Sequence, residues 1–259
     1  MEHKIILILL VSYFVLPGCK TRVKEREDSV YSRHLQRHVK LTVITTTMPD
    51  NKEEMNLLLM NNGQDLEQLD ARKIIDSLYK NKLIQPLLTV GIHGYKEEYG
   101  FAGLGTTSPQ KYNDFIRNEL YPFIKKKAVT RKFKSITVAG CSLAGVSAFD
   151  IAWNNADKIS KAGIISPELN FAGTTGLLNN AIEFINASRK RPHLQFWIYA
   201  AENGDTAALK NTTTFIKTLE SKSNITPADI FFSSEKNGSN NFRSWRNQFA
   251  AFLLWAFAK

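Results

Sequence analysis

Cysteine is scarce in this 259-residue chain, and so are long apolar runs. The two cysteines, Cys19 and Cys141, are too few for a disulfide scaffold or for a zinc site built from several thiolates. The apolar run from Ile5 to Leu16 is shorter than the ~20 residues that a membrane-spanning helix needs. With 14 glycines, 8 prolines and 22% charged residues, the composition also argues against a collagen-like or disordered chain. The length suits one large α/β domain.

Acidic residues are outnumbered, 24 Asp and Glu against 34 Lys and Arg, which gives a formal net charge of +10. Such a charge permits attraction to anionic lipid or nucleic acid without establishing either. The basic runs at 125–134 and 188–193 flank expected helices and strands and lack an interleaved aromatic pattern. We interpret them as solvated surface, and no nucleic-acid partner is expected.

The first 19 residues resemble the signal of an exported bacterial lipoprotein. A charged head ending at Lys4 precedes the apolar run, which ends in Leu-Pro-Gly-Cys at 16–19. This ending resembles the lipobox, in which the cysteine is lipidated and becomes the first residue of the mature protein. We therefore predict a signal peptide at 1–18, a lipid on Cys19 that anchors the protein to a cell-envelope membrane, and a polar tether at 19–37. The alternative is a plain secretory signal in which Cys19 is incidental.

Apolar strands and amphipathic helices alternate in the rest of the sequence. Strands are expected at 38–46, 55–60, 87–92, 135–139, 162–165, 194–200 and 229–233. Helices are expected at 66–80, 110–127, 143–154, 207–221 and 242–258. This alternation predicts an α/β fold, in which a mostly parallel central sheet is covered by helices on both faces. No internal repeat or linker divides the segment 38–259, so we predict one domain there.

One turn carries the clearest chemistry. The sequence Gly140-Cys141-Ser142-Leu143-Ala144-Gly145 joins an expected strand to an expected helix, which is the context of a nucleophile elbow with Ser142 at its apex. The N-terminus of the helix offers backbone N–H groups, that of Leu143 among them, to a developing oxyanion. The pattern alone is weak because Ala144 stands where G-x-S-x-G has glycine. An ordinary turn with an incidental serine is the alternative.

Several further motifs occur along the chain in this order: LLLMNNGQDL, VGIHGYKEEYG, NELYPFI, ITVAGCSLAG, ISPELNF and NGSNNFRSWRNQF. Together they resemble the segments of the putative-esterase family, which includes esterase D and the enterobactin esterases. The resemblance covers about residues 38–257. It implies the α/β-hydrolase fold and hydrolysis of small or carbohydrate-linked carboxylic esters, with neither a cofactor nor a metal.

The resemblance also assigns residues to roles. Ser142 matches the nucleophile, and Asp205 matches the acid of the catalytic triad. Leu143 and the loop at Gly63 and Gln64 match the groups that bind the oxyanion. Aromatic residues expected at the same edge of the sheet could line a substrate cleft: Tyr95, Tyr99, Phe101, Phe171 and Phe242.

The histidine of the triad is missing. Counting back from Trp245, the position of the family's histidine falls on Asn240, and none of the five histidines follows His193. A general base must take the serine proton and return it to the leaving group, which a neutral amide cannot do. His93 follows an expected strand and is the candidate for a substitute base. We interpret Cys141 as a small buried residue rather than a nucleophile.

Two functions are compatible with these residues. In the first, the chain is a lipid-anchored, degenerate esterase whose fold and cleft persist for binding a small-molecule or glycan ester. In the second, it is an active carboxylic-ester hydrolase that uses Ser142 with a non-standard base such as His93. The missing histidine favours the first function, although the family resemblance favours the label of esterase.

Overall fold

The computed structural model describes residues 22–47, 54–101, 107–128, 132–169, 176–190, 192–202, 206–222, 224–235 and 237–259. The predicted signal peptide, the lipidation site Cys19 and the predicted acid Asp205 lie outside these residues. Within the described ranges, no helix combines the length and the apolar character needed to cross a membrane.

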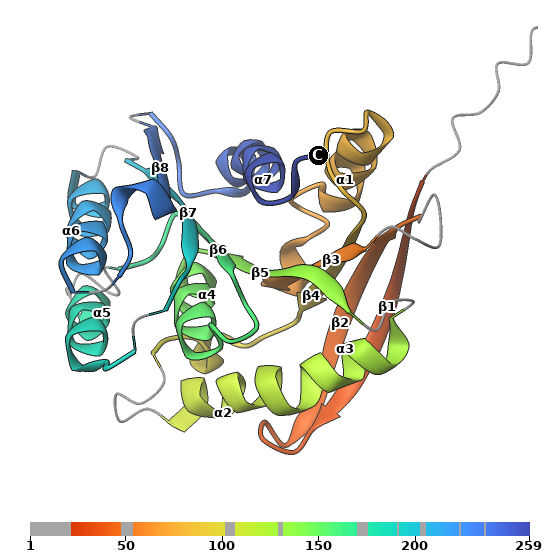
Figure 1. Ribbon diagram of the computed structural model, residues 1–259, viewed down its shortest axis with the longest axis horizontal. Coiled ribbons are helices and arrows are strands. Elements are labelled where there is room, and N and C mark those ends of the chain that lie inside the picture. Colours follow the sequence, from red (N-terminus) through yellow and green to blue (C-terminus); the bar gives the residue numbers. More distant parts are fainter. Residues whose placement is uncertain are drawn as a thin grey trace, which may run out of the picture.

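A single sheet of eight strands runs through the molecule in the order β1-β2-β4-β3-β5-β6-β7-β8 (Figure 1). The strands are β1 Val23–Ser32, β2 Arg37–Thr46, β3 Met55–Asn61, β4 Leu87–Ile92, β5 Phe133–Cys141, β6 Lys161–Ile165, β7 Gln195–Ala201 and β8 Ile230–Glu235. The pairs β1–β2 and β2–β4 are antiparallel, and every other pair is parallel. The prediction of a mostly parallel α/β sheet is therefore confirmed.

Helices cover both faces of this sheet (Figure 1). The helices are α1 Ala71–Lys80, α2 Thr107–Phe115, α3 Tyr121–Lys127, α4 Leu143–Asn154, α5 Gly176–Ala187, α6 Thr206–Lys222 and α7 Phe242–Phe257. Helices α1 and α7 lie on one face, and α2 to α6 lie on the other. The predicted helix at 66–80 begins only at Ala71, because residues 66–70 form a turn. Helix α5 was not predicted.

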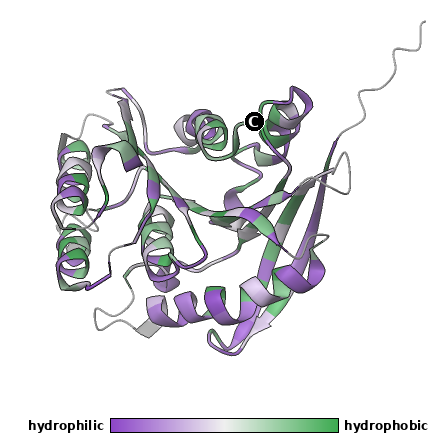
Figure 2. Cartoon of the chain, viewed as in Figure 1, coloured by the Kyte–Doolittle hydropathy of each residue, from purple (hydrophilic) through white to green (hydrophobic). Residues whose placement is uncertain are grey.

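Each face of the sheet has its own apolar core. Alternate residues of β3 divide between the two: Leu57 and Leu59 join the core beneath α2 to α6, whereas Leu58 and Met60 join the core beneath α1 and α7. All residues of β3 and β4 are buried, as expected for central strands covered on both faces. Figure 2 shows the matching pattern, with hydrophobic residues on the central strands and hydrophilic residues on the edge strand β1 and the outer faces of the helices. Packing on both faces holds the central strands in place. The candidate site lies where these strands end, at the carboxyl edge of the sheet.

The predicted tether at 19–37 is wrong for Val23–Ser32, because these residues form β1 at the edge of the sheet. All ten residues of β1 pair with β2. The charged side chains that suggested a solvated linker are exposed on the strand, with one exception. Asp28 accepts hydrogen bonds from Lys127 and Arg26, which ties β1 to the end of α3. An edge strand needs backbone pairing more than apolar side chains, which explains the misleading composition.

Replacing Asp28 by asparagine should destabilise the protein by about 1 kcal/mol at neutral pH. Burial would raise the pKa of Asp28, but hydrogen bonds from Lys127, Arg26 and the Ser29 backbone outweigh it and lower the pKa from 3.8 to about 2. The carboxylate therefore stabilises the fold above pH ~4, and this contribution disappears as the pH falls through ~4 toward ~2. The effect is small because solvent screens the partners Arg26 and Lys127, whose side chains are about half exposed, at 53% and 47%.

Urea denaturation at pH 7 and at acidic pH measures this difference. The matched control is Glu27→Gln, because Glu27 pairs with Lys40 on the surface, where both side chains are more than half exposed, at 66% and 52%. The control should change the free energy of unfolding by less than about 0.5 kcal/mol. Equal stability of the Asp28→Asn variant and the wild type at pH 7 would show that the Asp28 carboxylate does not stabilise the fold.

The predicted helix at 110–127 is one continuous helix with an irregular centre. Between α2 and α3, residues Ile116–Leu120 form a wider π-type turn. Pro122 stands at the start of α3 and has no backbone N–H, so the regular hydrogen bond to the carbonyl four residues earlier cannot form. A π turn accommodates that missing bond without ending the helix.

Candidate active site

Ser142 lies between the end of β5 and the start of α4 in a backbone conformation that few residues adopt. Its φ is 56° and its ψ is −128°. The strained conformation is held from both sides, since the Ser142 N–H donates to the Ile165 carbonyl at 2.9 Å and the Gly145 N–H donates to the Ser142 carbonyl at 3.0 Å. A sharp strand-to-helix turn with a strained serine at its apex has the geometry of a nucleophile elbow.

The residues beside the apex must be small for the turn to close. A Cβ atom on Gly140 would lie 2.3 Å from the Ala144 carbonyl oxygen, so β5 and the first turn of α4 can approach only if residue 140 is glycine. Ala144 itself is 1% exposed, and its methyl group joins the core beneath α2 to α6. The alanine that weakened the motif in the sequence is therefore accommodated in the elbow.

A carboxylate contacts the Ser142 hydroxyl. Ser142 Oγ donates a hydrogen bond to Glu168 Oε2 at 2.8 Å. Glu168 comes from the loop after β6, in the run Ser166-Pro167-Glu168, where Ser166 has a φ of 46°. Glu168 was not among the predicted site residues, although it follows the Ser-Pro pair of the motif ISPELNF.

The loop after β3 lies on the other side of the elbow. Asn62, in the left-handed conformation with a φ of 61°, accepts a hydrogen bond on Oδ1 from the Cys141 N–H at 3.3 Å. Gly63 follows, and a Cβ atom there would lie 2.3 Å from the carbonyl carbon of Gly91 in β4. The loop with Gly63 and Gln64 is thus placed beside the turn that carries Ser142 and Leu143. The Gln64 side chain turns away and donates to the Gly94 carbonyl at 3.3 Å.

Asn240 lies just before α7. Its Oδ1 accepts a hydrogen bond from Trp245 Nε1 at 3.1 Å, and the next residue, Asn241, caps the helix. Asn240 borders a cavity of about 170 Å³ at the carboxyl edge of the sheet. The other lining residues are Ser166, Pro167, Ala200, Ala201, Glu202, Ala208 and Thr212. The cavity therefore places Asn240 beside the loop that carries Glu168.

The sequence matches the model of a family described as putative esterase over residues 32–256. The chain belongs to this family. No curated protein matches the sequence. Among solved structures, a ferulic acid esterase superimposes with a TM-score of 0.71 at 16% identity, over 92% of this chain and 99% of that one.

Two further solved structures resemble this esterase-family chain. The enterobactin esterase of Shigella flexneri has a TM-score of 0.72 and 17% identity, over 90% of this chain. The present chain spans only 59% of that protein. An IroE-like serine hydrolase from Shewanella oneidensis has a TM-score of 0.65 and 16% identity, over 90% of this chain and 80% of that one. At such identities the comparison establishes the shared fold.

In this esterase-family chain, His93 points toward β2 and away from the elbow. Its Nε2 lies 2.8 Å from Thr42 Oγ1, and its backbone N–H donates to the Lys40 carbonyl. Burial, and then the positive charge of Lys40, lower the pKa of His93. Strand β3 separates β4 from β5, so two strand spacings, about 10 Å, lie between the strand ends that carry His93 and Ser142. This position does not support His93 as a substitute base.

Cys141 lies directly before Ser142 but is 1% exposed. Burial raises the pKa of its thiol far above the usual range, so the side chain stays a protonated thiol at neutral pH. Its side chain packs in the core beneath α1 and α7. The structure thus supports the interpretation of Cys141 as a buried filler.

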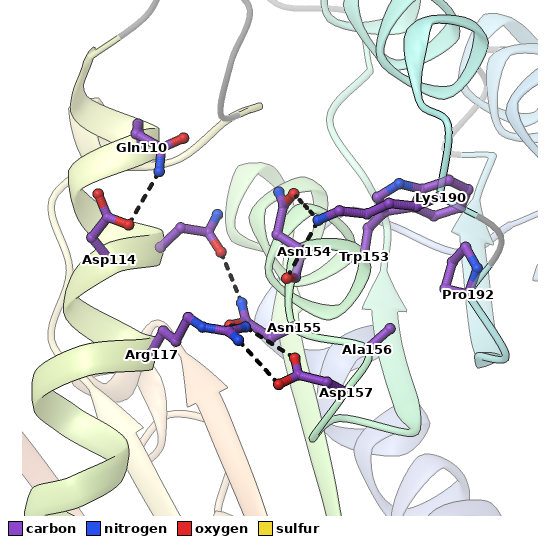
Figure 3. Close-up of a pocket in the computed structure, with 11 residues that line it drawn as sticks. Gln110, Asp114, Arg117, Trp153, Asn154, Asn155, Ala156, Asp157, Lys190 and Pro192 are labelled. Carbon is purple, nitrogen blue, oxygen red and sulfur yellow. Dashed lines mark hydrogen bonds and ion pairs between the residues drawn. The ribbon is translucent and has the colours of Figure 1, made fainter.

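A second, polar cavity of about 620 Å³ lies at the opposite end of α4 (Figure 3). Arg117 donates to Asp157 at 2.9 Å and to Asn155 at 3.2 Å, and Lys190 donates to Asn154 Oδ1 at 3.0 Å. Figure 3 shows these side chains directed at one another. Helix α4 is about 18 Å long, so this cavity is remote from Ser142 and is not part of the elbow site.

Proposed function

We propose that this protein is a lipid-anchored member of the esterase family that binds ester ligands at Ser142 without hydrolysing them efficiently. The anchor would be the lipid on Cys19, which would hold an exported chain to a membrane of the cell envelope. The contact that carries the proposal is the hydrogen bond of 2.8 Å from Ser142 Oγ to Glu168. It is supported by Asn240, which stands where the family resemblance predicts the histidine.

The chemistry of these two side chains supports inefficient hydrolysis. An effective general base has a pKa near the working pH, as imidazole does, whereas carboxylates are ordinarily much weaker bases. The amide of Asn240 is not basic, and its oxygen is already the acceptor for Trp245 Nε1. An ester of an ordinary alcohol also needs a proton donor for its leaving alkoxide. An imidazolium would supply that proton, whereas Asn240 has none to give and Glu168 could return one only after taking it from Ser142, for which a carboxylate is ordinarily a weak base.

The surroundings of the elbow support binding of an ester with an aromatic part. Tyr95 is 59% exposed, and the Arg37 guanidinium lies 4.3 Å from the centre of its ring. Arg37 is itself fixed by two hydrogen bonds to Glu98. The Tyr95 loop adjoins Gln64, which donates to Gly94. The other candidate cleft residues Tyr99 and Phe101 are buried, and Phe171 lies outside the described residues.

Methyl ferulate tests this function, because it combines an aromatic acyl group with a poor leaving group. Calorimetric titration should give the same Kd for the wild type and the Ser142→Ala variant, and chromatography afterwards should recover the ester intact. Absence of binding to both proteins would overturn the binding role. Release of ferulate at 1 s⁻¹ or faster by the wild type, but not by the variant, would contradict the proposal that hydrolysis is inefficient.

A further inference from the structure

The proton of Ser142 already has an acceptor in this structure. We infer that Glu168 accepts this proton and that Ser142 is acylated by esters of acidic alcohols, such as phenols, with the reaction slowing at the acyl-enzyme. The inference rests on the proposed function and names the base and the substrate class of the same site.

The position of Glu168 is fixed by its neighbours along the chain. Before it, the Ser166 N–H donates to the Tyr199 carbonyl in β7 at 2.7 Å. After it, the Leu169 N–H donates to the Pro167 carbonyl at 3.0 Å, and the Leu169 carbonyl accepts from the Leu178 N–H at 3.1 Å. Leu169 is also buried, at 4% exposure. The loop is therefore held on both sides of Glu168, which keeps the carboxylate oriented toward the serine.

Among the described residues, Glu168 has no cationic partner. No lysine, arginine or histidine in the described ranges forms an ion pair with it. Asp28 is the contrast, because its cationic partners Lys127 and Arg26 stabilise the ionised form and weaken it as a base. The partner that the structure gives the Glu168 carboxylate is instead the hydroxyl of Ser142, at 2.8 Å.

Acylation of Ser142 requires only Ser142, Glu168 and the ester. Ser142 Oγ bonds to the acyl carbon while its proton moves to Glu168 Oε2. The bond from the acyl carbon to the phenolic oxygen breaks, and the phenolate leaves with the electron pair. A phenolate that is stable near neutral pH needs no proton, so the proton now on Glu168 does not have to reach the leaving group in this half of the reaction. In the second half the leaving group is the Ser142 alkoxide, a much poorer one, so the acyl-enzyme accumulates.

Two variants separate a base from a residue that only orients the serine. In Glu168→Gln, the amide oxygen can still accept the hydrogen bond from Ser142 but cannot take up the proton. Glu168→Ala removes both functions and leaves room for an added carboxylate. The matched control is Glu97→Gln, because Glu97 is an exposed carboxylate near the same edge of the sheet, between Tyr95 and Tyr99.

The experiment mixes the full chain with excess p-nitrophenyl acetate and follows the intact mass and the released phenolate over time. The wild type and Glu97→Gln should gain one acetyl group on Ser142, with a burst of about one equivalent of phenolate. Glu168→Gln should be acylated at least about 100-fold more slowly, with an unchanged melting temperature. Formate should accelerate acylation of Glu168→Ala.

Acylation of Glu168→Gln or Glu168→Ala at the wild-type rate would overturn the inference, and so would a folded wild type that gains no acetyl group. Failure of the proposed function looks different. In that case the wild type would turn over many equivalents of ester through Ser142, and the dependence on Glu168 would still be tested by the same variants.

Discussion

Replacing Asn240 by histidine should raise the turnover of p-nitrophenyl acetate at least about 100-fold over the wild type. Asn240 shares a cavity with Ser166 and Pro167, the two residues that precede Glu168. An imidazole in that cavity would lie beside the loop that carries Glu168, the residue in contact with Ser142. It would take the serine proton near neutral pH and return it to the leaving group, which the amide cannot do and for which a carboxylate is ordinarily a much weaker base.

The gain is measured as steady-state release of p-nitrophenolate at pH 7. It should vanish in the double variant Asn240→His, Ser142→Ala. The matched control is Asn237→His, an exposed position in the same loop that does not line the cavity, and it should leave the rate unchanged. If a folded Asn240→His protein showed no gain, alone or with Ala144→Gly, the missing histidine would not be what limits this site.

Adding one methyl group to the elbow should have the second large effect. Gly140→Ala should destabilise the protein by about 3 kcal/mol and abolish acylation of Ser142. The new Cβ would lie 2.3 Å from the Ala144 carbonyl oxygen and 2.5 Å from its carbon, both backbone atoms, so the first turn of α4 must move away from β5. That movement would displace Ser142 and the Leu143 N–H together.

Gly145→Ala is the matched control, since the same methyl group is added one turn later in the same motif. Its Cβ would lie 3.0 Å from the Gly140 carbonyl oxygen, a contact that a small shift relieves. We therefore expect a loss below about 1 kcal/mol for this variant in urea denaturation. A Gly140→Ala protein as stable and as readily acylated as Gly145→Ala would show that the elbow does not depend on the close approach of Gly140 to the Ala144 backbone.

The central part of the fold could be predicted from the sequence because its strands are buried on both faces. Continuous apolar runs identified β3 and β4, and the helix expected at 143–154 has the bounds of α4. Strand β1 gave no such signal, since its stability comes from pairing with β2 and its side chains are mostly charged. Helix α5 buries Leu178, Ala181 and Ile185 at helical spacing, a short pattern that we did not recognise.

The location of the site could also be predicted in part, from the arrangement of the parallel strands. Parallel strands end at one edge, so Ser142 after β5, the loop after β3 and the loop after β6 had to lie near one another. What the sequence could not provide is the direction of side chains on loops. The contact between Glu168 and Ser142 depends on the left-handed conformation of Ser166, and the orientation of His93 toward Thr42 depends on its hydrogen bonds. Neither follows from spacing or periodicity.

The number of ester molecules that each Ser142 converts tests the account most directly. With p-nitrophenyl acetate in large excess at pH 7, we expect the unmodified protein to release about one equivalent of phenolate in a burst and then to continue far below 1 s⁻¹. Sustained release at 1 s⁻¹ or faster that disappears in Ser142→Ala would contradict the account and identify an efficient esterase.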